Sequence, residues 1–106
     1  MAEHLSVHDH VDAPAGYQEL LDRGSMSVGL YQLAAGSEDP QSPHAENEIY
    51  YILSGRAKLR VADEVVSVNP GDLVFVGRET DHEFFDIQEA LATLVVFAPA
   101  EGSLES

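Results

Sequence analysis

Short runs in which hydrophobic and polar residues alternate follow one another along the chain, a pattern typical of half-buried β-strands. The run 25–33 predicts one such strand, with a bend at Gly29. One face of this strand is expected to carry Met26, Val28, Leu30 and Gln32. The segments before it are less regular: 3–11 fits an edge strand or a loose arm, and 17–21 fits a short strand or one helical turn.

After a polar loop over 34–43, strands are expected in quick succession. The β-rich runs cover 48–53, 56–61, 64–68, 73–76, 82–87 and 91–98. Turn sequences separate several of them, namely Ser54-Gly55, Ala62-Asp63 and Asn69-Pro70-Gly71-Asp72. Because roughly eight short strands occur without a convincing helix, the pattern predicts an all-β barrel or sandwich.

A chain of 106 residues, of which 44% are hydrophobic, has enough apolar side chains for one core but not for two. We therefore expect a single domain over 1–106. The barrel should occupy about 25–99, with 1–24 as an N-terminal arm or edge strands and 100–106 as a tail.

The charge balance restricts the partners that the protein can have. Asp and Glu number 19 and Lys and Arg five, so this acidic protein has a net charge of −14, which disfavours nucleic acid and anionic membranes. Without a recognisable signal peptide or a long apolar run, it is expected to be soluble and cytoplasmic. It has no cysteine, so any metal must be held by nitrogen and oxygen atoms.

Two histidines and a glutamate stand where strands are expected to begin. His44 and Glu48 lie four residues apart, so both side chains point to the same face of an extended chain. His82 opens another strand after the polar loop 77–81. We expect the three side chains to meet at one mouth of the barrel. They would either bind a metal ion or form the polar lining of a metal-free pocket.

The spacing around these residues resembles the first motif of the cupin superfamily, which runs from a glycine through His-x-His and a glutamate to a second glycine. Here the motif reads Gly36, S-E-D-P-Q, Ser42-Pro43-His44, A-E-N, Glu48, I-Y-Y-I-L-S, Gly55. Every spacing is kept, but Ser42 stands in place of the first histidine.

The second cupin motif contains a glycine, Pro-x-Gly, a histidine and an asparagine. Here it reads Gly71, D-L-V-F-V, Gly77-Arg78-Glu79, T-D, His82, E-F-F, Asp86. The spacing is again kept, whereas Gly77, Glu79 and Asp86 replace the proline, glycine and asparagine. The two motifs together extend over 36–86.

This resemblance to small single-domain cupins, the monocupins of conserved-barrel type, implies a jelly roll or double-stranded β-helix. It makes His44, Glu48 and His82 ligands of a divalent metal, which would be Fe(II), Mn(II), Ni(II) or Zn(II). Glu46 or Ser42 would supply a further oxygen ligand. Small cupins are often homodimers, and the apolar run 91–97 is expected to help form such an interface.

Other residues have both a functional and a plain structural interpretation. The candidates for lining a substrate pocket are Tyr50, Gln32, Phe75 and Phe84, of which the aromatic ones would otherwise be ordinary core. The pair His8 and His10 is expected to be exposed rather than metal-binding. The alternating Arg56, Lys58 and Arg60 are expected on a solvated face, or alternatively against the acidic surface of a second subunit.

Two functions therefore remain open. One is a metal-dependent enzyme, an oxidoreductase of dioxygenase type or an isomerase, acting on a small hydroxy acid, keto-enol compound or sugar. The fold alone does not choose between such reactions. The alternative is a non-catalytic cupin that binds a small ligand and has a degenerate or empty metal site, which Ser42 and the altered second motif favour.

Overall fold

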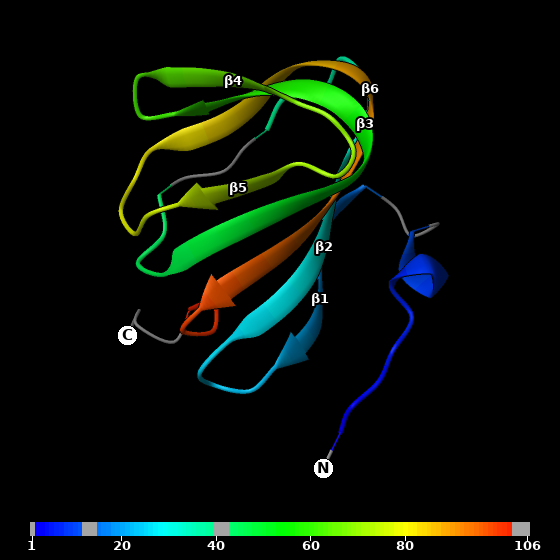
Figure 1. The fold of residues 1–106 in the computed structure, drawn as a ribbon, viewed down its shortest axis with the longest axis vertical. Coiled ribbons are helices and arrows are strands. Elements are labelled where there is room, and N and C mark those ends of the chain that lie inside the picture. Colours follow the sequence, from blue (N-terminus) through cyan, green and yellow to red (C-terminus); the bar gives the residue numbers. More distant parts are fainter. Residues whose placement is uncertain (1, 12–14, 40–42, 103–106) are drawn as a thin grey trace.

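The computed structural model describes residues 2–11, 15–39 and 43–102, and nearly all of its regular structure is β-strand (Figure 1). The strands are β1 (Gly16–Asp22), β2 (Ser27–Leu33), β3 (Asn47–Val61), β4 (Glu64–Val68), β5 (Leu73–Val76) and β6 (His82–Ala98). They form one antiparallel sheet in the order β1-β2-β6-β3-β4, and β5 pairs with β3. The predicted all-β class is confirmed.

The two longest strands, β3 and β6, pair from Asn47 opposite Ala98 to Val61 opposite His82 and bend together (Figure 1). The bend divides the sheet into two halves that face each other. One half contains β4 with the end of β3 and the start of β6, and the other contains β1, β2 and β5 with the remaining parts of β3 and β6. The core lies between these halves.

Ser54-Gly55 is an irregularity within β3 and not the turn that the sequence predicts. The pairing with β6 shifts register between Ile52 and Lys58, and Gly55 has a φ of +92°. A Cβ at position 55 would lie 2.2 Å from the carbonyl oxygen of Ala90, so only glycine lets β6 pass this closely. The prediction of separate strands over 82–87 and 91–98 is also wrong, because β6 runs through both.

The bulge changes which residues of β3 face inward. Before it, Glu48, Tyr50 and Ile52 are buried, whereas after it Ala57 and Leu59 are buried. Buried residues from both halves fill the interior: Tyr31, Leu33, Tyr50, Ile52, Leu59, Val68, Val76, Phe84, Ile87, Leu91, Val95 and Phe97. Glu48 therefore lies at the end of a row of inward-facing side chains in β3 that is otherwise apolar.

The basic row of β3 pairs with acids of the same chain. Arg56 lies 2.5 Å from Glu89, and Lys58 lies 3.6 Å from Asp86, both across the β3–β6 pairing. Arg60 lies 3.2 Å from Asp81. Since these side chains are exposed or only partly buried, each pair is expected to stabilise the fold by no more than about 1 kcal/mol. The row therefore lies on a solvated face, with its charge balanced locally.

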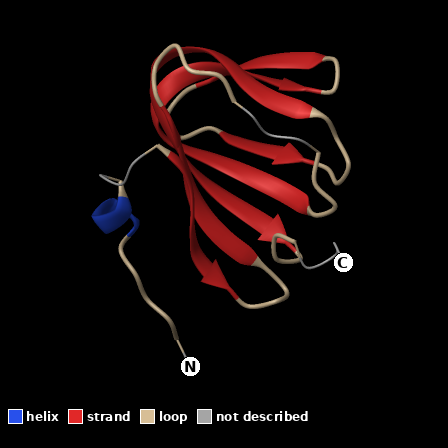
Figure 2. Ribbon diagram, turned by 180° about the vertical axis from the view of Figure 1, so that it is seen from behind, coloured by secondary structure: helices blue, strands red, loops and turns tan. Residues whose placement is uncertain are grey.

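The segment 3–11 forms an arm rather than an edge strand, and it contains the 3-10 helix η1 (Val7–His10). The arm lies along the outside of the sheet, away from the C-terminal end (Figure 2). Leu5 and Val7 border a groove there with Val28 and Leu94, while Gln18 donates to His10 at 3.1 Å. Within the described ranges, no helix has the length and apolar character needed to cross a membrane.

Candidate metal centre

The folded sheet brings together His44, Glu48 and His82. Glu48 is the second residue of β3, His44 lies just before this strand, and His82 begins β6 in the opposite half of the sheet. One donor atom from each residue lies within 4.8 Å of the other two. Glu48 and His82 are buried, with 2% and 1% of their surfaces exposed, and His44 is half-buried.

The imidazole of His82 is oriented by the backbone. Its Nδ1 lies 2.8 Å from the carbonyl oxygen of Thr80, and because a carbonyl only accepts, Nδ1 carries the hydrogen. Nε2 is thereby directed toward the Glu48 carboxylate, 3.0 Å from Oε1. This is the arrangement typical of metal-binding histidines, in which the second ring nitrogen donates to a backbone carbonyl.

Glu48 and His82 approach closely without forming a hydrogen bond of acceptable geometry. Both carboxylate oxygens of Glu48 and Nε2 of His82 lack a hydrogen-bond partner. Burial lowers the pKa of His82, but the facing Glu48 carboxylate and the Thr80 carbonyl outweigh it, so the pKa is raised. A buried carboxylate without a hydrogen-bond donor is costly, and a cation between these atoms would reduce that cost.

The donor set fits a divalent metal. Two imidazole nitrogens and one carboxylate oxygen suit Fe(II), Mn(II), Ni(II) and Zn(II), and they leave coordination positions open for a ligand. Glu46 is also buried, with 1% exposed and neither oxygen hydrogen-bonded, but its carboxylate is not part of the cluster. Ser42, the other suggested ligand, lies outside the described residues.

A cavity of about 110 Å³ adjoins the cluster. Besides His44 and Glu48, it is lined by Tyr17, Tyr31, Val95, Phe97 and Glu101. These residues come from β1, β2, β6 and the segment after β6, so the cavity lies against the half of the sheet that contains the edge strand β1.

None of the four predicted pocket residues lines this cavity. Phe75 is 60% exposed and belongs to the outer face of β5, so its assignment to the pocket is wrong. Gln32 alternates with the cavity-lining Tyr31 along β2 and therefore points to the opposite face, which corrects that assignment too. Tyr50 and Phe84 are buried in the core, where their rings make a T-shaped contact at 4.8 Å.

Tyr31, which sequence reasoning did not select, is held by a buried carboxylate. Its hydroxyl donates to Oδ1 of Asp39 at 2.5 Å, and Oδ2 of Asp39 accepts from the backbone N–H of Phe84 at 2.9 Å. Burial raises the pKa of Tyr31 above its usual value, and the hydrogen bond to Asp39 and the charge of Asp39 raise it further, so the phenol keeps its proton. Asp39 thus links β2 to β6 and fixes one wall of the cavity.

Tyr17 forms the wall nearest the sheet edge. Its ring lies 6.5 Å from the ring of Tyr31 and 6.2 Å from that of Phe97, centroid to centroid. It reaches this place by crossing Gly29, where a Cβ would lie 2.2 Å from the Tyr17 hydroxyl oxygen. A glycine in the middle of a strand was the signal in the sequence for such a close approach.

Comparison with known proteins agrees with this fold. Residues 29–97 match the cupin domain family. An uncharacterized protein of Streptomyces coelicolor is 46% identical over 85 residues, which are 80% of this chain and 81% of that protein. The chain therefore belongs to the cupin family.

Solved structures show the same barrel. A Thermus thermophilus protein superimposes with a TM-score of 0.78 at 21% identity, covering 93% of this chain and 99% of that one, which is a likeness of fold alone. A DMSP lyase from Ruegeria pomeroyi gives a TM-score of 0.69 at 27% identity over 79% of this chain. The match covers only 42% of the lyase, less than half of its length.

Proposed function

We propose that this cupin is a metal-dependent enzyme that acts on a small organic molecule bound in the cavity beside Glu48. The observation that carries this proposal is the convergence of unpartnered donor atoms of Glu48 and His82 with His44 next to a cavity. When bound there, a divalent metal would supply Lewis-acid chemistry toward substrate oxygens or activate dioxygen.

The protein's own residues have separate roles in this proposal. His44, Glu48 and His82 hold the metal, and the Thr80 carbonyl keeps the His82 ring in its binding orientation. Tyr31, fixed by Asp39, forms part of the cavity wall, and the cavity is mostly apolar. Such walls exclude water from the reacting molecule and favour a single binding orientation.

The cavity limits the size of the substrate. Its volume of about 110 Å³ is the volume that about four molecules occupy in liquid water. This volume is below the range of pockets that bind drug-sized molecules. A small hydroxy acid or keto-enol compound fits this limit better than a sugar ring does. Dioxygenase and isomerase reactions remain the two principal candidates, and the likeness to a DMSP lyase supports a lyase as a third.

The test is turnover by the metal-loaded protein. Protein loaded anaerobically with Fe(II) or Mn(II) would be offered a panel of hydroxy acids and 1,3-dicarbonyls, with oxygen uptake and product NMR as the measurements. We expect turnover of at least one compound by the wild type and none by Glu48→Gln. Oxygen uptake with product would identify a dioxygenase, and product without oxygen uptake an isomerase or lyase.

A second candidate function is a cupin that binds a small ligand without converting it. The three-residue cluster favours it, because Glu46 does not complete a fourth ligand position among the described residues. Saturable binding of a panel compound without turnover by fully metal-loaded protein would support this function and exclude the enzyme. If the protein holds no metal and still binds the compound, the site is a metal-free pocket.

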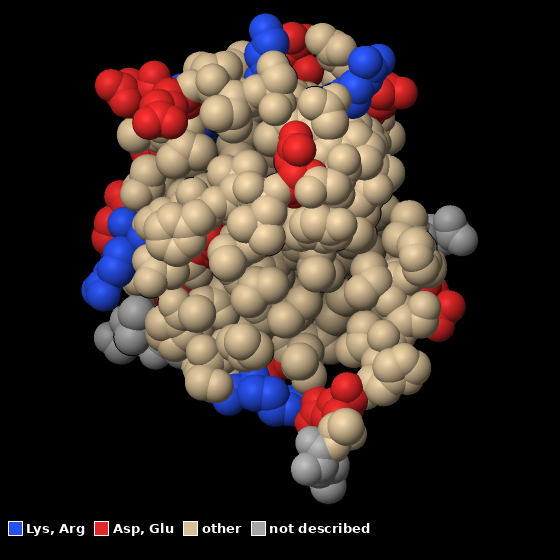
Figure 3. All heavy atoms as spheres, viewed as in Figure 1, with Lys and Arg blue, Asp and Glu red and all other residues tan. Residues whose placement is uncertain are grey.

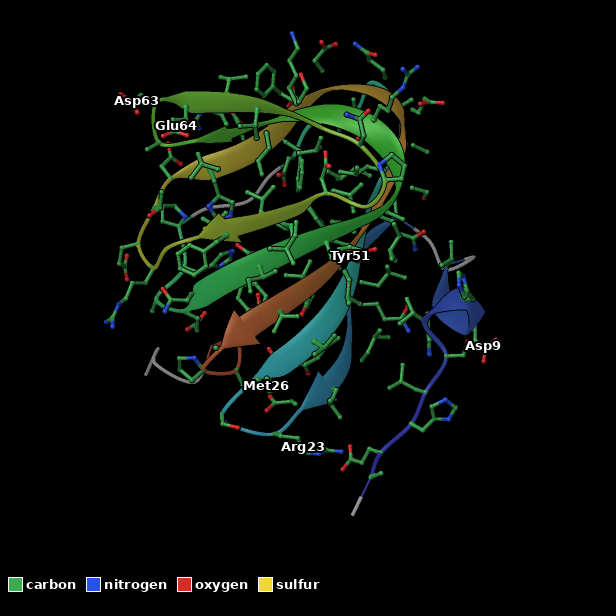
Figure 4. All side chains as sticks on the ribbon, in the orientation of Figure 1. Asp9, Arg23, Met26, Tyr51, Asp63 and Glu64 are labelled. Carbon is green, nitrogen blue, oxygen red and sulfur yellow. The ribbon has the colours of Figure 1, made fainter. Side chains whose placement is uncertain are left out.

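We also infer that the protein pairs with a second copy through the outer face of β3 and β5. Exposed apolar residues of adjacent strands gather on this face, where Phe75 lies opposite Ile49 and Leu73 opposite Tyr51. Figure 4 shows Tyr51 projecting near the middle of the view, and Figure 3 shows charged side chains mainly at the edges of that view. In a chain of net charge −14, a weakly charged face is where two copies repel each other least.

A further inference from the structure

The segment after β6 is anchored beside the cavity at residues 100 and 101. The backbone N–H of Ala100 donates to the carbonyl of Gly24 at 3.0 Å, and that of Glu101 donates to the hydroxyl of Ser27 at 2.9 Å. Ser27 and Ala100 are both buried, at 0% and 1% exposed. Two consecutive hydrogen bonds, one to the β1–β2 turn and one to the first residue of β2, therefore fix the position from which the Glu101 side chain extends.

Glu101 adds a further carboxyl group to the lining of the cavity. Of the described residues that line it, Glu101 is the one charged side chain outside the metal cluster, and neither lysine nor arginine is among them. The rest of that wall is formed by Tyr17, Tyr31, Val95 and Phe97. The part of a ligand that does not contact the metal would thus meet aromatic rings and the Glu101 carboxyl group.

The surroundings of Glu101 are negative. Burial is the largest of the effects that raise the pKa of Glu101. His44 lowers this pKa, whereas the carboxylates of Glu19, Glu46 and Glu48 raise it further. A second carboxylate brought by a ligand would add to this repulsion, whereas a hydroxyl or ammonium group would donate a hydrogen bond to Glu101. The aromatic rings also favour a positive group over a negative one.

We propose that Glu101 is a specificity-determining residue, which selects small acids whose end remote from the metal carries a hydrogen-bond donor and rejects those with a second carboxylate there. This proposal rests on the proposed function, since the metal would hold the other end of the ligand. It narrows the substrate class to small hydroxy or amino acids.

The experiment measures binding of three matched probes to Mn(II)-loaded protein by titration calorimetry, after the metal content has been determined. The probes are 3-hydroxypropionate, 3-aminopropionate and malonate. We expect the wild type to bind the first two at least roughly tenfold more tightly than malonate, because two carboxylates would otherwise face each other. Glu101→Gln should bring the three affinities close together, and Glu101→Lys should make malonate the preferred probe.

Glu19→Gln is the matched control, because Glu19 contributes to the same field from the exposed face of β1 without lining the cavity. It should keep the wild-type order of affinities. A metal-free wild type would overturn the proposed function and this selectivity with it. Fully metal-loaded protein that shows the same order in wild type and Glu101→Lys, or that binds neither donor probe, would overturn the selectivity alone.

Discussion

The hydroxyl end of Tyr17 occupies the space in which a side chain at position 29 would lie. A Cβ built on Gly29 would come within 2.2 Å of the Tyr17 hydroxyl oxygen. An aromatic residue of the edge strand can therefore cross its neighbour β2 and reach the cavity beside Glu48, where it is 37% exposed. The lack of a side chain at one position determines the shape of the cavity wall.

Gly29→Ala is expected to move Tyr17 out of the cavity. Since the colliding atoms are the far end of a partly exposed side chain, the ring can rotate away, and the free energy of unfolding should fall by only about 1 kcal/mol. Urea unfolding measures this loss. In a Tyr17→Ala background the same substitution should cost nothing, so an equal loss in both backgrounds would show that Tyr17 is not the group displaced.

Gly55→Ala is expected to be far more damaging than Gly71→Ala. Both glycines have a φ of +92°, which costs a residue with a side chain about 1–2 kcal/mol. At position 71 no atom lies within 4 Å of an added Cβ, so this is the whole expected loss. At position 55 the added Cβ would collide with the Ala90 carbonyl, so the loss of unfolding free energy should exceed about 4 kcal/mol. Similar losses in the two variants would contradict the close passage of β6.

Tyr31→Phe removes the hydroxyl that donates to Asp39 and should lower the free energy of unfolding by about 1–3 kcal/mol. Asp39→Ala should cost more, because the buried backbone N–H of Phe84 also loses its acceptor. Combining the two should cost less than the sum of the single losses. Strict additivity in chemical denaturation would mean that the two residues do not act together.

Phe75→Glu is expected to separate the two copies of the proposed dimer. The substitution places a charge in each copy on the apolar face formed with Ile49, in a chain that is already strongly negative. Light scattering should change from the dimer mass to the monomer mass. Val65→Glu, at another exposed apolar position on β4, should leave the mass unchanged. A wild-type protein that is monomeric would contradict the interface.

Alternation of residue types was enough to predict the β class, but it could not locate the ends of the longest strands. Ser54-Gly55 has the sequence of a hairpin turn, and the neighbouring residues do not distinguish such a turn from a bulge. The glycine is required because the backbone of Ala90, distant in the sequence, passes close to it. In β6 the chain passes through Asp86 at a φ of 48° without leaving the sheet. Both irregularities depend on the pairing of β3 with β6, which is a tertiary property.

The convergence of His44, Glu48 and His82 was predictable because it depends on spacing along single strands and on a family motif, whereas the cavity depends on which face of each strand is buried. In β2 both faces are mostly apolar, with Val28 and Leu30 on one and Tyr31 and Leu33 on the other. The outer face is partly sheltered by the N-terminal arm, so hydrophobicity did not distinguish it from the inner face. The sequence pattern therefore predicts Gln32 for the cavity, whereas Tyr31 lines it.

The most direct test is the metal content of protein purified without a His tag and loaded anaerobically with Fe(II) or Mn(II). We predict about one bound ion per chain by mass spectrometry, a loss of affinity of at least about tenfold in Glu48→Gln and His82→Ala, and no change in the control His10→Ala. Glu46→Gln should retain the full metal content, since its carboxylate is outside the cluster. A wild type that stays substoichiometric after loading, or a His82→Ala variant that binds metal as tightly as the wild type, would contradict the assignment.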